Sequence, residues 1–363
     1  MNIELSIKKL FYSFFRIIFR NKNINKPLNK GEVTNILVLR YDAIGDMIVT
    51  LSVLRMLKQL IPESNIDIIA STRNISILDS ESIVRNKYVQ PVGFFKSLIQ
   101  ALTIRKNKYD LILSLVLNDT TKAGLIANLA GTQKTTKAVI EHKKRRDIYS
   151  ALFNLQIPLH EFRKKITMLE LQCKFVAEIF GLNSYENLIV NKMSISKVDR
   201  EFAERKTNGL TPFIIYNISS GNDYRTFSTN KNVEILDKIM QELTEYNLII
   251  ISAPNDERKA KEIRDKVNSN RVKVCDSMSL TQVTAVIDLS TIVFTPDTSI
   301  VHIASATQTP VFLIYSLLSS HVEEWLPFGV QFAYVRTKTR EPIENIETNE
   351  VVDGFLDFVK DLK

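Results

Sequence analysis

The sequence lacks several motifs that mark common classes of nucleotide-dependent enzyme. Glycine is sparse, at ten of 363 residues, and no Gly-x-Gly-x-x-Gly or Walker sequence occurs, which argues against dinucleotide dehydrogenases and P-loop enzymes. Asp-x-Asp is also absent, so the chain offers no evident acidic clamp for a metal-bound diphosphate. The length and a hydrophobic content of 45% are nevertheless sufficient for two globular domains, each with its own core.

Cysteine is scarce as well, since the chain has only Cys173 and Cys275. Both lie in apolar segments, and neither belongs to a Cys-x-x-Cys or Cys/His pattern. We therefore expect two reduced, buried cysteines in a cytoplasmic protein, and neither a disulfide nor a metal site.

Long apolar runs are missing too. No uncharged apolar run approaches the roughly 18 to 20 residues that a membrane-spanning helix needs. A secretory signal, with an uninterrupted apolar centre and a small-residue cleavage site, is not evident. The net charge of +8 is concentrated in residues 1–30, which carry seven basic residues and one acidic residue. Because the rest of the chain is nearly balanced, we expect no nucleic-acid partner.

Residues 1–30 form a basic tail that is rich in phenylalanine and isoleucine. The first part of this tail is typical of a helix that lies on an anionic cytoplasmic leaflet, with its apolar side chains at the headgroup level. The alternative is a helix packed on the protein's own surface, because apolar residues occupy two faces of the helical wheel. The sequence leaves both possibilities open.

Both halves of the chain alternate between apolar runs typical of buried parallel strands and helices with apolar residues three or four positions apart. In the first half, residues 31–190, the run Asn35–Arg40 precedes a helix, and Ile66–Ala70 follows as the next strand. The polar stretch 191–208 is predicted to be a linker, after which the alternation restarts over residues 209–363. This pattern predicts two doubly wound, Rossmann-like α/β domains that face one another across a cleft.

Polar residues follow the first predicted strand, at the end where parallel sheets bind ligands. Asp42, Gly45 and Asp46 lie there, and Asp46 falls in the first turn of the next helix. Such a carboxylate is either a structural acid favoured by the helix dipole or a general base beside a bound hydroxyl group. After the later strand Tyr109–Leu117, Lys122 either meets an acidic group of the substrate or stays solvated.

Three loops of the second half end at one predicted sheet edge and form a candidate donor-binding site. Their polar residues are Ser219, Ser220, Arg225, Asp256, Glu257, Asp297, Thr298 and Ser299. Arg225 offers a fork-shaped positive charge suited to phosphate, and the two acidic residues at 256 and 257 are suited to ribose hydroxyls. The turn at 297–299 begins a helix whose first N–H groups can hold phosphate, although an ordinary capped helix has the same pattern.

Two motifs in this chain resemble those of glycosyltransferase family 9, the ADP-heptose:lipopolysaccharide heptosyltransferases. The first is a strand followed by Arg/Lys-x-x-x-x-Gly-Asp, matched by Arg40, Gly45 and Asp46. The second is Asp-Thr-Gly-x-x-His-x-Ala-Ala-Ala, which the stretch Asp297–Ala306 resembles, with Ser299 in place of the family glycine. The resemblance extends over most of the chain.

This resemblance implies a GT-B fold, in which the first domain binds the acceptor and the second binds a nucleotide sugar. It implies an inverting transfer without a metal or cofactor. In that reaction, Asp46 removes the proton of the acceptor hydroxyl and Arg225 stabilises the departing diphosphate. Gly45 and His302, which matches the family histidine, are then expected to contribute to donor binding.

The same resemblance implies the partners and the location of the protein. Arg40, Asp42 and Lys122 are expected to contact an anionic glycolipid acceptor, such as a lipopolysaccharide core, and ADP-heptose is the expected donor. We expect a monomer on the inner face of a bacterial cytoplasmic membrane. Two alternatives remain, a nucleotide-sugar epimerase of similar fold and a catalytically inactive homologue that binds sugars or serves as a scaffold.

Overall fold

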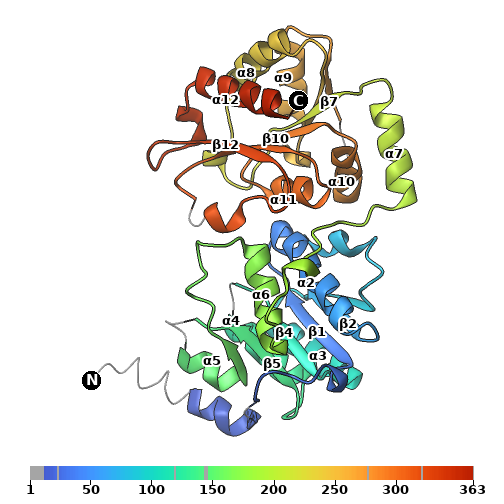
Figure 1. Ribbon diagram of the computed structural model, residues 1–363, viewed down its shortest axis with the longest axis vertical. Helices are drawn as coiled ribbons and strands as arrows, with labels where there is room; N and C mark the ends of the chain where they lie inside the picture. Colours follow the sequence, from blue (N-terminus) through green and yellow to red (C-terminus); the bar gives the residue numbers. More distant parts are fainter. Residues whose placement is uncertain are drawn as a thin grey trace. The chain divides into compact units, whose positions relative to one another are not determined.

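The computed structural model describes residues 12–22, 24–117, 120–142, 146–275, 278–319 and 322–362. The chain divides into two compact units, Met1–Val190 (unit 1) and Asn191–Lys363 (unit 2). Each unit is built around a six-stranded parallel sheet with helices packed on it (Figure 1). The predicted pair of Rossmann-like α/β domains is confirmed.

The sheet of unit 1 has the strand order β3-β2-β1-β4-β5-β6, and every neighbouring pair is parallel. Its strands are β1 (Asn35–Arg40), β2 (Asn65–Ala70), β3 (Asn86–Val89), β4 (Leu111–Ser114), β5 (Thr136–Ile140) and β6 (Leu155–Ile157). Its labelled helices are α2 (Ile44–Leu60), α3 (Phe94–Ile104), α4 (Thr120–Ala130), α5 (Arg146–Leu152) and α6 (Met168–Phe180). The central strands are almost entirely buried, as expected for a parallel sheet with helices on both faces.

The helices of unit 1 form two layers. Side chains of α3, α4 and α5 pack in one apolar cluster with Leu37 and Leu39 of β1. Because successive side chains of a strand point to opposite faces, Arg40 of β1 points to the other face, where it contacts α2. Helices α2 and α6 pack against each other.

The tail contributes a helix at residues 12–19, which packs on the α3–α5 side of unit 1. Phe15 is buried in the cluster and stacks on Phe19 at 5.7 Å between ring centroids. Arg16 Nη2 donates to Ser150 Oγ of α5 at 2.5 Å. The exposed apolar side chains of this helix are Phe14, Ile17 and Ile18. One side of the predicted tail helix thus packs on the protein, whereas the first eleven residues of the tail lie outside the described residues.

Unit 2 repeats the topology of unit 1, with the strand order β12-β11-β10-β7-β8-β9 and parallel pairing throughout. Its strands are β7 (Phe213–Asn217), β8 (Asn247–Ile251), β9 (Val272–Val274), β10 (Ile292–Pro296), β11 (Val311–Tyr315) and β12 (Phe332–Arg336). Its helices are α7 (Lys197–Thr207), α8 (Thr229–Glu242), α9 (Glu257–Lys266), α10 (Leu280–Asp288), α11 (Ser299–Ala306) and α12 (Thr348–Asp361).

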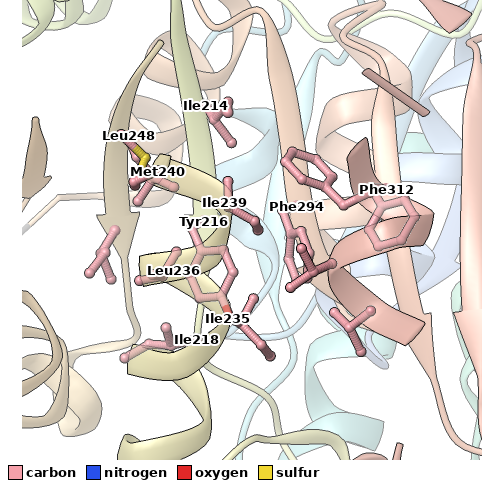
Figure 2. Packing of buried hydrophobic residues seen from close by; sticks show 14 of the residues in the cluster. Ile214, Tyr216, Ile218, Ile235, Leu236, Ile239, Met240, Leu248, Phe294 and Phe312 are labelled. Carbon is pink, nitrogen blue, oxygen red and sulfur yellow. The ribbon is translucent and has the colours of Figure 1, made fainter. Parts of the chain in front are cut away.

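A cluster of aromatic and aliphatic side chains forms the core of unit 2 (Figure 2). Phe294 of β10 lies at its centre, with ring centroids 4.7 Å from Tyr216 and 5.2 Å from both Phe312 and Phe355. These contacts join β7, β10, β11 and α12. The polar loops that follow β7 and β10 are therefore anchored to a rigid core.

In each sheet the strand order reverses beside the first strand of the unit, between β1 and β4 and between β7 and β10. Ligands of open parallel sheets bind at such switch points, beyond the carboxyl ends of the strands. The sequence-predicted residues at the ends of β1, β7 and β10 therefore lie where this topology favours a ligand.

The stretch predicted as a linker, 191–208, instead contains α7. Ser196 caps this helix by accepting a hydrogen bond from Asp199 N, and the helix packs against α10 of unit 2. The high charge of α7 made the stretch resemble a linker, although a helix with a polar outer face has the same composition.

The two cysteines, Cys173 and Cys275, are free and buried, as predicted. Across the described residues, no helix combines the length and apolar character that a bilayer span requires. Within the same ranges, no His, Cys, Asp and Glu side chains group together in a way that could hold a metal ion.

Candidate functional site

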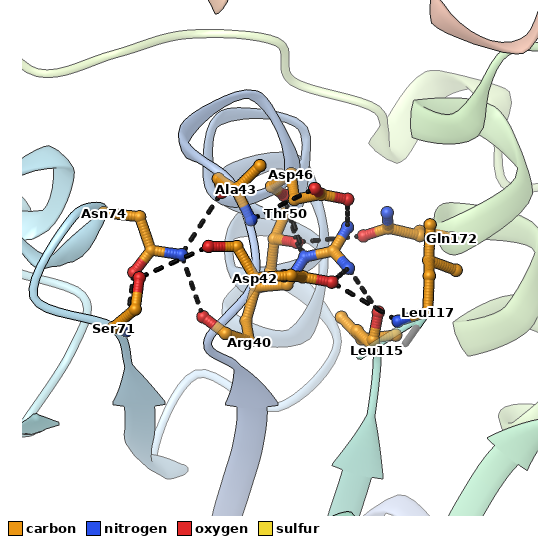
Figure 3. Close-up of polar contacts among 10 residues, drawn as sticks. All are labelled: Arg40, Asp42, Ala43, Asp46, Thr50, Ser71, Asn74, Leu115, Leu117 and Gln172. Atoms are coloured by element: carbon orange, nitrogen blue, oxygen red, sulfur yellow. Dashed lines mark hydrogen bonds and ion pairs between the residues drawn. The ribbon is translucent and has the colours of Figure 1, made fainter. Parts of the chain in front are cut away.

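The carboxyl end of β1 carries a polar network whose centre is the guanidinium group of Arg40 (Figure 3). The Arg40 side chain has no exposed surface. Its Nε lies 2.9 Å from both the Asp46 carbonyl oxygen and Thr50 Oγ1. Its Nη1 donates to the carbonyl oxygen of Leu115, just beyond β4. The guanidinium group therefore ties β1, α2 and the loop after β4 together at the switch point of unit 1.

Two carboxylates share this one guanidinium group. Arg40 Nη1 lies 3.1 Å from Asp42 Oδ2, and Arg40 Nη2 lies 3.1 Å from Asp46 Oδ1. Their side chains are only 13% and 12% exposed. Asp42 Oδ2 also accepts a hydrogen bond from Leu117 N, and Asp46 Oδ2 accepts one from Ala43 N, both at 3.3 Å. Each carboxylate is thus held in one orientation but keeps a small exposed surface.

The charges of this network do not balance, because one guanidinium group faces two carboxylates. Burial raises the pKa of Asp42, Arg40 opposes this rise, and the nearby charge of Asp46 adds to it. The excess negative charge makes the network a good proton acceptor. The Asp46 carboxylate accepts a hydrogen bond from Ala43, the residue before α2, and remains a candidate base.

Three further polar residues complete the network, and none of them was predicted from the sequence. Thr50 Oγ1 lies 2.8 Å from the Asp46 carbonyl oxygen and 3.0 Å from Gln172 Oε1. Asn74 Nδ2 donates to two backbone carbonyl groups of the β1–α2 connection, at 3.1 and 3.2 Å. Gln172 and Thr50 are 122 positions apart, so only the packing of α6 on α2 brings them together.

The structure corrects the expected role of Arg40. A fully buried side chain cannot contact an acceptor, so Arg40 holds the two carboxylates instead. Lys122 of α4 lies over the ring of Tyr41, 5.5 Å from its centroid, and Tyr41 follows β1 directly. Lys122 is therefore at the same edge of the sheet as Asp42. Gly45 is the buried second residue of α2.

In unit 2, Asn217 joins the loops that follow β7 and β10. Its Nδ2 donates to the Ser219 carbonyl oxygen at 3.1 Å, to Thr295 Oγ1 at 2.9 Å and to Thr298 Oγ1 at 3.3 Å. Asn217 and Thr295 were not predicted as site residues. The signal in the sequence is a single polar residue at or near the end of an apolar strand, which is too common to identify a site on its own.

Arg225 lies against the turn between β10 and α11. Its Nη1 donates to the Asp297 carbonyl oxygen at 3.0 Å and lies 3.2 Å from Asp297 Oδ2. Its guanidinium group also lies over the Tyr224 ring, 5.3 Å from the centroid. Among the described residues, its buried Nε has no hydrogen-bond partner. Arg225 and Asp297 thus meet at one edge of the sheet, as the sequence suggested, and the Arg225 side chain remains 23% exposed there.

Among the remaining predicted residues of unit 2, some contact a neighbouring loop and one shows only a local contact. Ser219 Oγ donates to Asp256 Oδ2 at 2.5 Å, so the loops after β7 and β8 also meet. Ser220 Oγ accepts a hydrogen bond from Asn222 N within its own loop, at 3.3 Å. Glu257 is the first residue of α9. Contacts between loops are therefore seen for Ser219 and Asp256, and only a local contact is seen for Ser220.

Thr298 is the residue that caps α11. Its Oγ1 accepts a hydrogen bond from Ile300 N at 3.3 Å, and Val301 N donates to the Thr298 carbonyl oxygen at 3.2 Å. Two of the first three N–H groups of α11 therefore already have acceptors. Contrary to the expectation from sequence, the turn at 297–299 offers few open N–H groups, and a phosphate would depend more on Arg225.

His302, predicted to help bind the donor, points into the protein. Its ring packs edge-on against Trp325, with 5.6 Å between centroids. Burial lowers the pKa of His302 to about 4, against a slight opposing effect of Asp297. His302 is thus a neutral packing residue beneath the turn at 297–299, which corrects its predicted contact with the donor.

Replacing His302 with phenylalanine is expected to make unit 2 less sensitive to acid. Between the ordinary histidine pKa of 6.5 and about 4, the unfolded chain binds a proton that the folded chain does not, so stability falls as the pH falls. The resulting loss of folding free energy is about 3 kcal/mol. Urea unfolding followed by Trp325 fluorescence should show a loss between neutral pH and pH 4 that is smaller in H302F by about this amount. An equal loss in both proteins would contradict the burial of a neutral imidazole.

Two Rossmann-like domains with polar loops at both switch points are the architecture of GT-B glycosyltransferases. The chain belongs to glycosyltransferase family 9 (heptosyltransferase), whose family model matches residues 96–352. The protein is therefore a glycosyltransferase, and the epimerase alternative is disfavoured. The matched range includes all the loops of unit 2 and begins after the segment that contains Asp46. A search of curated protein sequences finds no match.

Solved structures share the fold of the whole chain. A family 9 glycosyltransferase of Veillonella parvula has a TM-score of 0.76 at 14% identity, covering 94% of this chain and 100% of that chain. ADP-heptose lps heptosyltransferase II of E. coli has a TM-score of 0.72 at 17% identity, covering 90% and 99%. E. coli heptosyltransferase WaaC with ADP-2-deoxy-2-fluoro heptose has a TM-score of 0.68 at 16% identity, covering 91% and 100%. At such identities, the likeness establishes the fold.

Proposed function

We propose that this protein is an inverting glycosyltransferase that transfers heptose from ADP-heptose to a lipopolysaccharide core or another cell-surface glycan. Membership of family 9 (heptosyltransferase) supports this, as does the likeness in fold to the two E. coli heptosyltransferases. The observation that carries the proposal is the Asp46 carboxylate, which the buried Arg40 holds at the start of α2.

In the proposed reaction, Asp46 takes the proton of the acceptor hydroxyl group. The acceptor oxygen then forms a bond to the anomeric carbon of the donor sugar while the bond from that carbon to the diphosphate breaks. The nucleoside diphosphate leaves with the bonding electrons, and Arg225 stabilises its new negative charge. Asp42 and Lys122, at the same sheet edge as Asp46, are suited to orient the hydroxyl and acidic groups of the acceptor.

A titration calorimetry screen of ADP, UDP and GDP tests the choice of donor. We expect ADP to bind at least about tenfold more tightly than the other two, a difference of about 1.4 kcal/mol. Tighter binding of UDP or GDP would reject ADP as the donor nucleotide. Binding of none of the three would favour the inactive homologue. Analysis of the product by NMR then shows whether the anomeric configuration is inverted.

The proposal includes metal independence and a location at the cytoplasmic face of the membrane. The absence of Asp-x-Asp from the sequence supports metal independence, and the basic tail supports the location at the membrane. Rates measured with and without EDTA test the first. A loss of turnover that Mg²⁺ or Mn²⁺ restores would reject it.

Replacing Arg225 with alanine is expected to slow the transfer by about 30- to 1,000-fold, or about 2–4 kcal/mol, as for other anion-stabilising donors. The reason is that the partly exposed Arg225 side chain places a positive charge at the turn that follows β10. The matched control is Arg200→Ala, because Arg200 is also an ion-paired arginine of unit 2 but lies on α7. Equal rates for R225A and the native protein would remove Arg225 from the mechanism.

A further inference from the structure

Helix α3 of unit 1 is apolar on two sides. Its inner side packs on α4 through Ala101 and Ile104, which belong to the apolar cluster over the sheet. Its outer side carries Phe95, Ile99 and Leu102, which recur at helical spacings of four and three. A surface helix of a soluble protein normally has a polar outer side, so the apolar outer side of α3 needs a partner.

The outer side of α3 is well exposed. Phe95 is 77% exposed, Ile99 is 62% exposed and Leu102 is 50% exposed. Val92, in the turn before the helix, is 90% exposed and extends the same apolar surface. We call these four residues the α3 outer face. Exposed apolar residues are ordinary when they are scattered, but four within eleven positions of one helix and its preceding turn are not.

The two chain segments that carry the exposed apolar side chains have charge of one sign. Residues 91–108 contain four basic residues and no acidic residue, namely Lys96, Arg105, Lys106 and Lys108. The described tail segment 12–22 likewise contains three basic residues and no acidic residue, namely Arg16, Arg20 and Lys22. An apolar strip bordered by positive charge is complementary to a bilayer with anionic headgroups.

The tail helix lies on the same face of the sheet as α3. Its residue Phe15 and the α3 residue Ala101 belong to one cluster. Just after the tail helix, Asn21 Oδ1 accepts a hydrogen bond from Lys137 Nζ at 2.9 Å. Burial lowers the pKa of Lys137 to about 8, and the charge of Arg105, which follows α3, contributes. Both helices therefore lie on the same face of the sheet of unit 1.

We propose that the α3 outer face, together with the exposed side of helix 12–19, docks unit 1 on an anionic lipid bilayer. The apolar side chains enter the headgroup region, while the surrounding lysine and arginine side chains contact lipid phosphates. This inference rests on the membrane location proposed above and assigns the docking surface to the folded body of unit 1 as well as to the tail. A second copy of the chain is the other possible occupant, but two copies would face each other with the basic residues of segments 91–108 and 12–22, which repel.

Cosedimentation of the full chain with vesicles tests this surface. Binding to phosphatidylglycerol/phosphatidylcholine vesicles should weaken about tenfold or more in the variant F95Q/I99Q, because two large apolar side chains no longer leave water. The matched control is Val198→Gln, since Val198 of α7 is 72% exposed and lies in unit 2. Vesicles of phosphatidylcholine alone should bind the native protein more weakly, and K96Q/K106Q should reduce this preference.

A second measurement reports on insertion directly. Cys173 and Cys275 are buried, and burial raises the pKa of Cys173 to about 12, so a new exposed cysteine can be labelled selectively. An environment-sensitive fluorophore on Ile99→Cys should shift its emission to the blue when anionic vesicles are added. The same label on Val198→Cys should not shift.

Three results would overturn the proposal. They are equal vesicle binding by F95Q/I99Q and the native protein, an unchanged spectrum of the label at position 99, and a native dimer that F95Q/I99Q converts to a monomer. Vesicle binding is measured without donor or acceptor, so its failure is independent of the proposed sugar transfer. Turnover of a soluble acceptor should be the same in F95Q/I99Q and the native protein.

Discussion

Replacing Asp46 with asparagine is expected to lower kcat by about 100- to 10,000-fold, the usual loss when a general base is removed. Asparagine has nearly the same size and can still accept the hydrogen bond that Asp46 Oδ2 receives from Ala43 N. It cannot take a proton from an acceptor hydroxyl group. The fold of α2 should therefore persist while the proton transfer is lost. Initial rates with saturating donor and acceptor measure the effect.

The matched control for this change is Asp42→Asn. Asp42 pairs with the same guanidinium group at the same distance of 3.1 Å, so both variants remove one negative charge from one network. Asp42→Asn should cost much less turnover, because the proton acceptor remains. If Asp46→Asn keeps its turnover, or if the two variants lose it equally, Asp46 is not the base.

The pH profile separates a lost base from a disturbed site. In the native protein, kcat/KM should rise with pH as the base loses its proton, and this acidic limb should be absent from D46N. In D42N the limb should remain, because the proton acceptor is still present. A purely structural role of Asp46 would change the height of the profile and leave its shape.

Local sequence pattern was sufficient for the central strands and for some helix ends. Strand β1 has the predicted bounds, because it is a buried apolar run flanked by polar residues. Helix α6 ends before Gly181 as predicted, at a residue with φ of 64° that glycine adopts without strain. Its apolar pattern predicts a helix from about Arg163, but the helix begins at Met168, because Thr167 and Glu170 form the capping box that starts it.

Three of the edge strands, β3, β6 and β12, were not predicted. Strand β12 alternates between exposed and half-buried residues, and β3 and β6 have only four and three residues. Such segments become strands because a neighbouring strand pairs with them, and a single sequence does not contain that information.

In the candidate site too, local sequence pattern identified some residues, whereas residues brought in by distant segments were missed. Asp42 and Asp46 stand next to the end of an apolar strand, so a local pattern was enough to select them. The partners that orient them, Thr50 and Gln172, come from facing helices and could not be selected in that way. The burial of Arg40 was also hidden, because an arginine after an apolar run is usually an exposed strand end.

Replacing Arg40 with methionine is expected to destabilise unit 1 by about 3–5 kcal/mol, the usual cost of removing one partner from a buried ion pair. Methionine fills much of the same volume but leaves two largely buried carboxylates without their cation. It also leaves the carbonyl oxygens of Asp46 and Leu115 without a guanidinium donor. The stability of the variant Arg40→Lys should lie between those of R40M and the native protein. An ammonium group keeps the positive charge but cannot reach all of these acceptors.

Urea unfolding can assign this loss to unit 1. The one tryptophan, Trp325, lies in unit 2, so its fluorescence follows unit 2, whereas circular dichroism follows both units. In R40M the circular dichroism transition should shift or split while the fluorescence midpoint changes little. A shift of the fluorescence midpoint alone would contradict the central role of Arg40 in unit 1.

The triple variant R40M/D42N/D46N tests whether unpaired charge is the cause. Removing a complete buried ion network costs far less than removing one member, so the triple variant should be clearly more stable than R40M.

The pH dependence of the stability of R40M is a second test of whether unpaired charge is the cause. Without Arg40, the largest effect that opposes burial is lost and the pKa of Asp42 rises further, so its carboxyl group stays neutral in the folded state up to a higher pH. The unfolded chain releases that proton near the ordinary value of 3.8, so R40M loses stability as the pH rises above it. The difference between R40M and the native protein should therefore be largest at neutral pH and smallest in acid, whereas a simple packing defect would give the same difference at both.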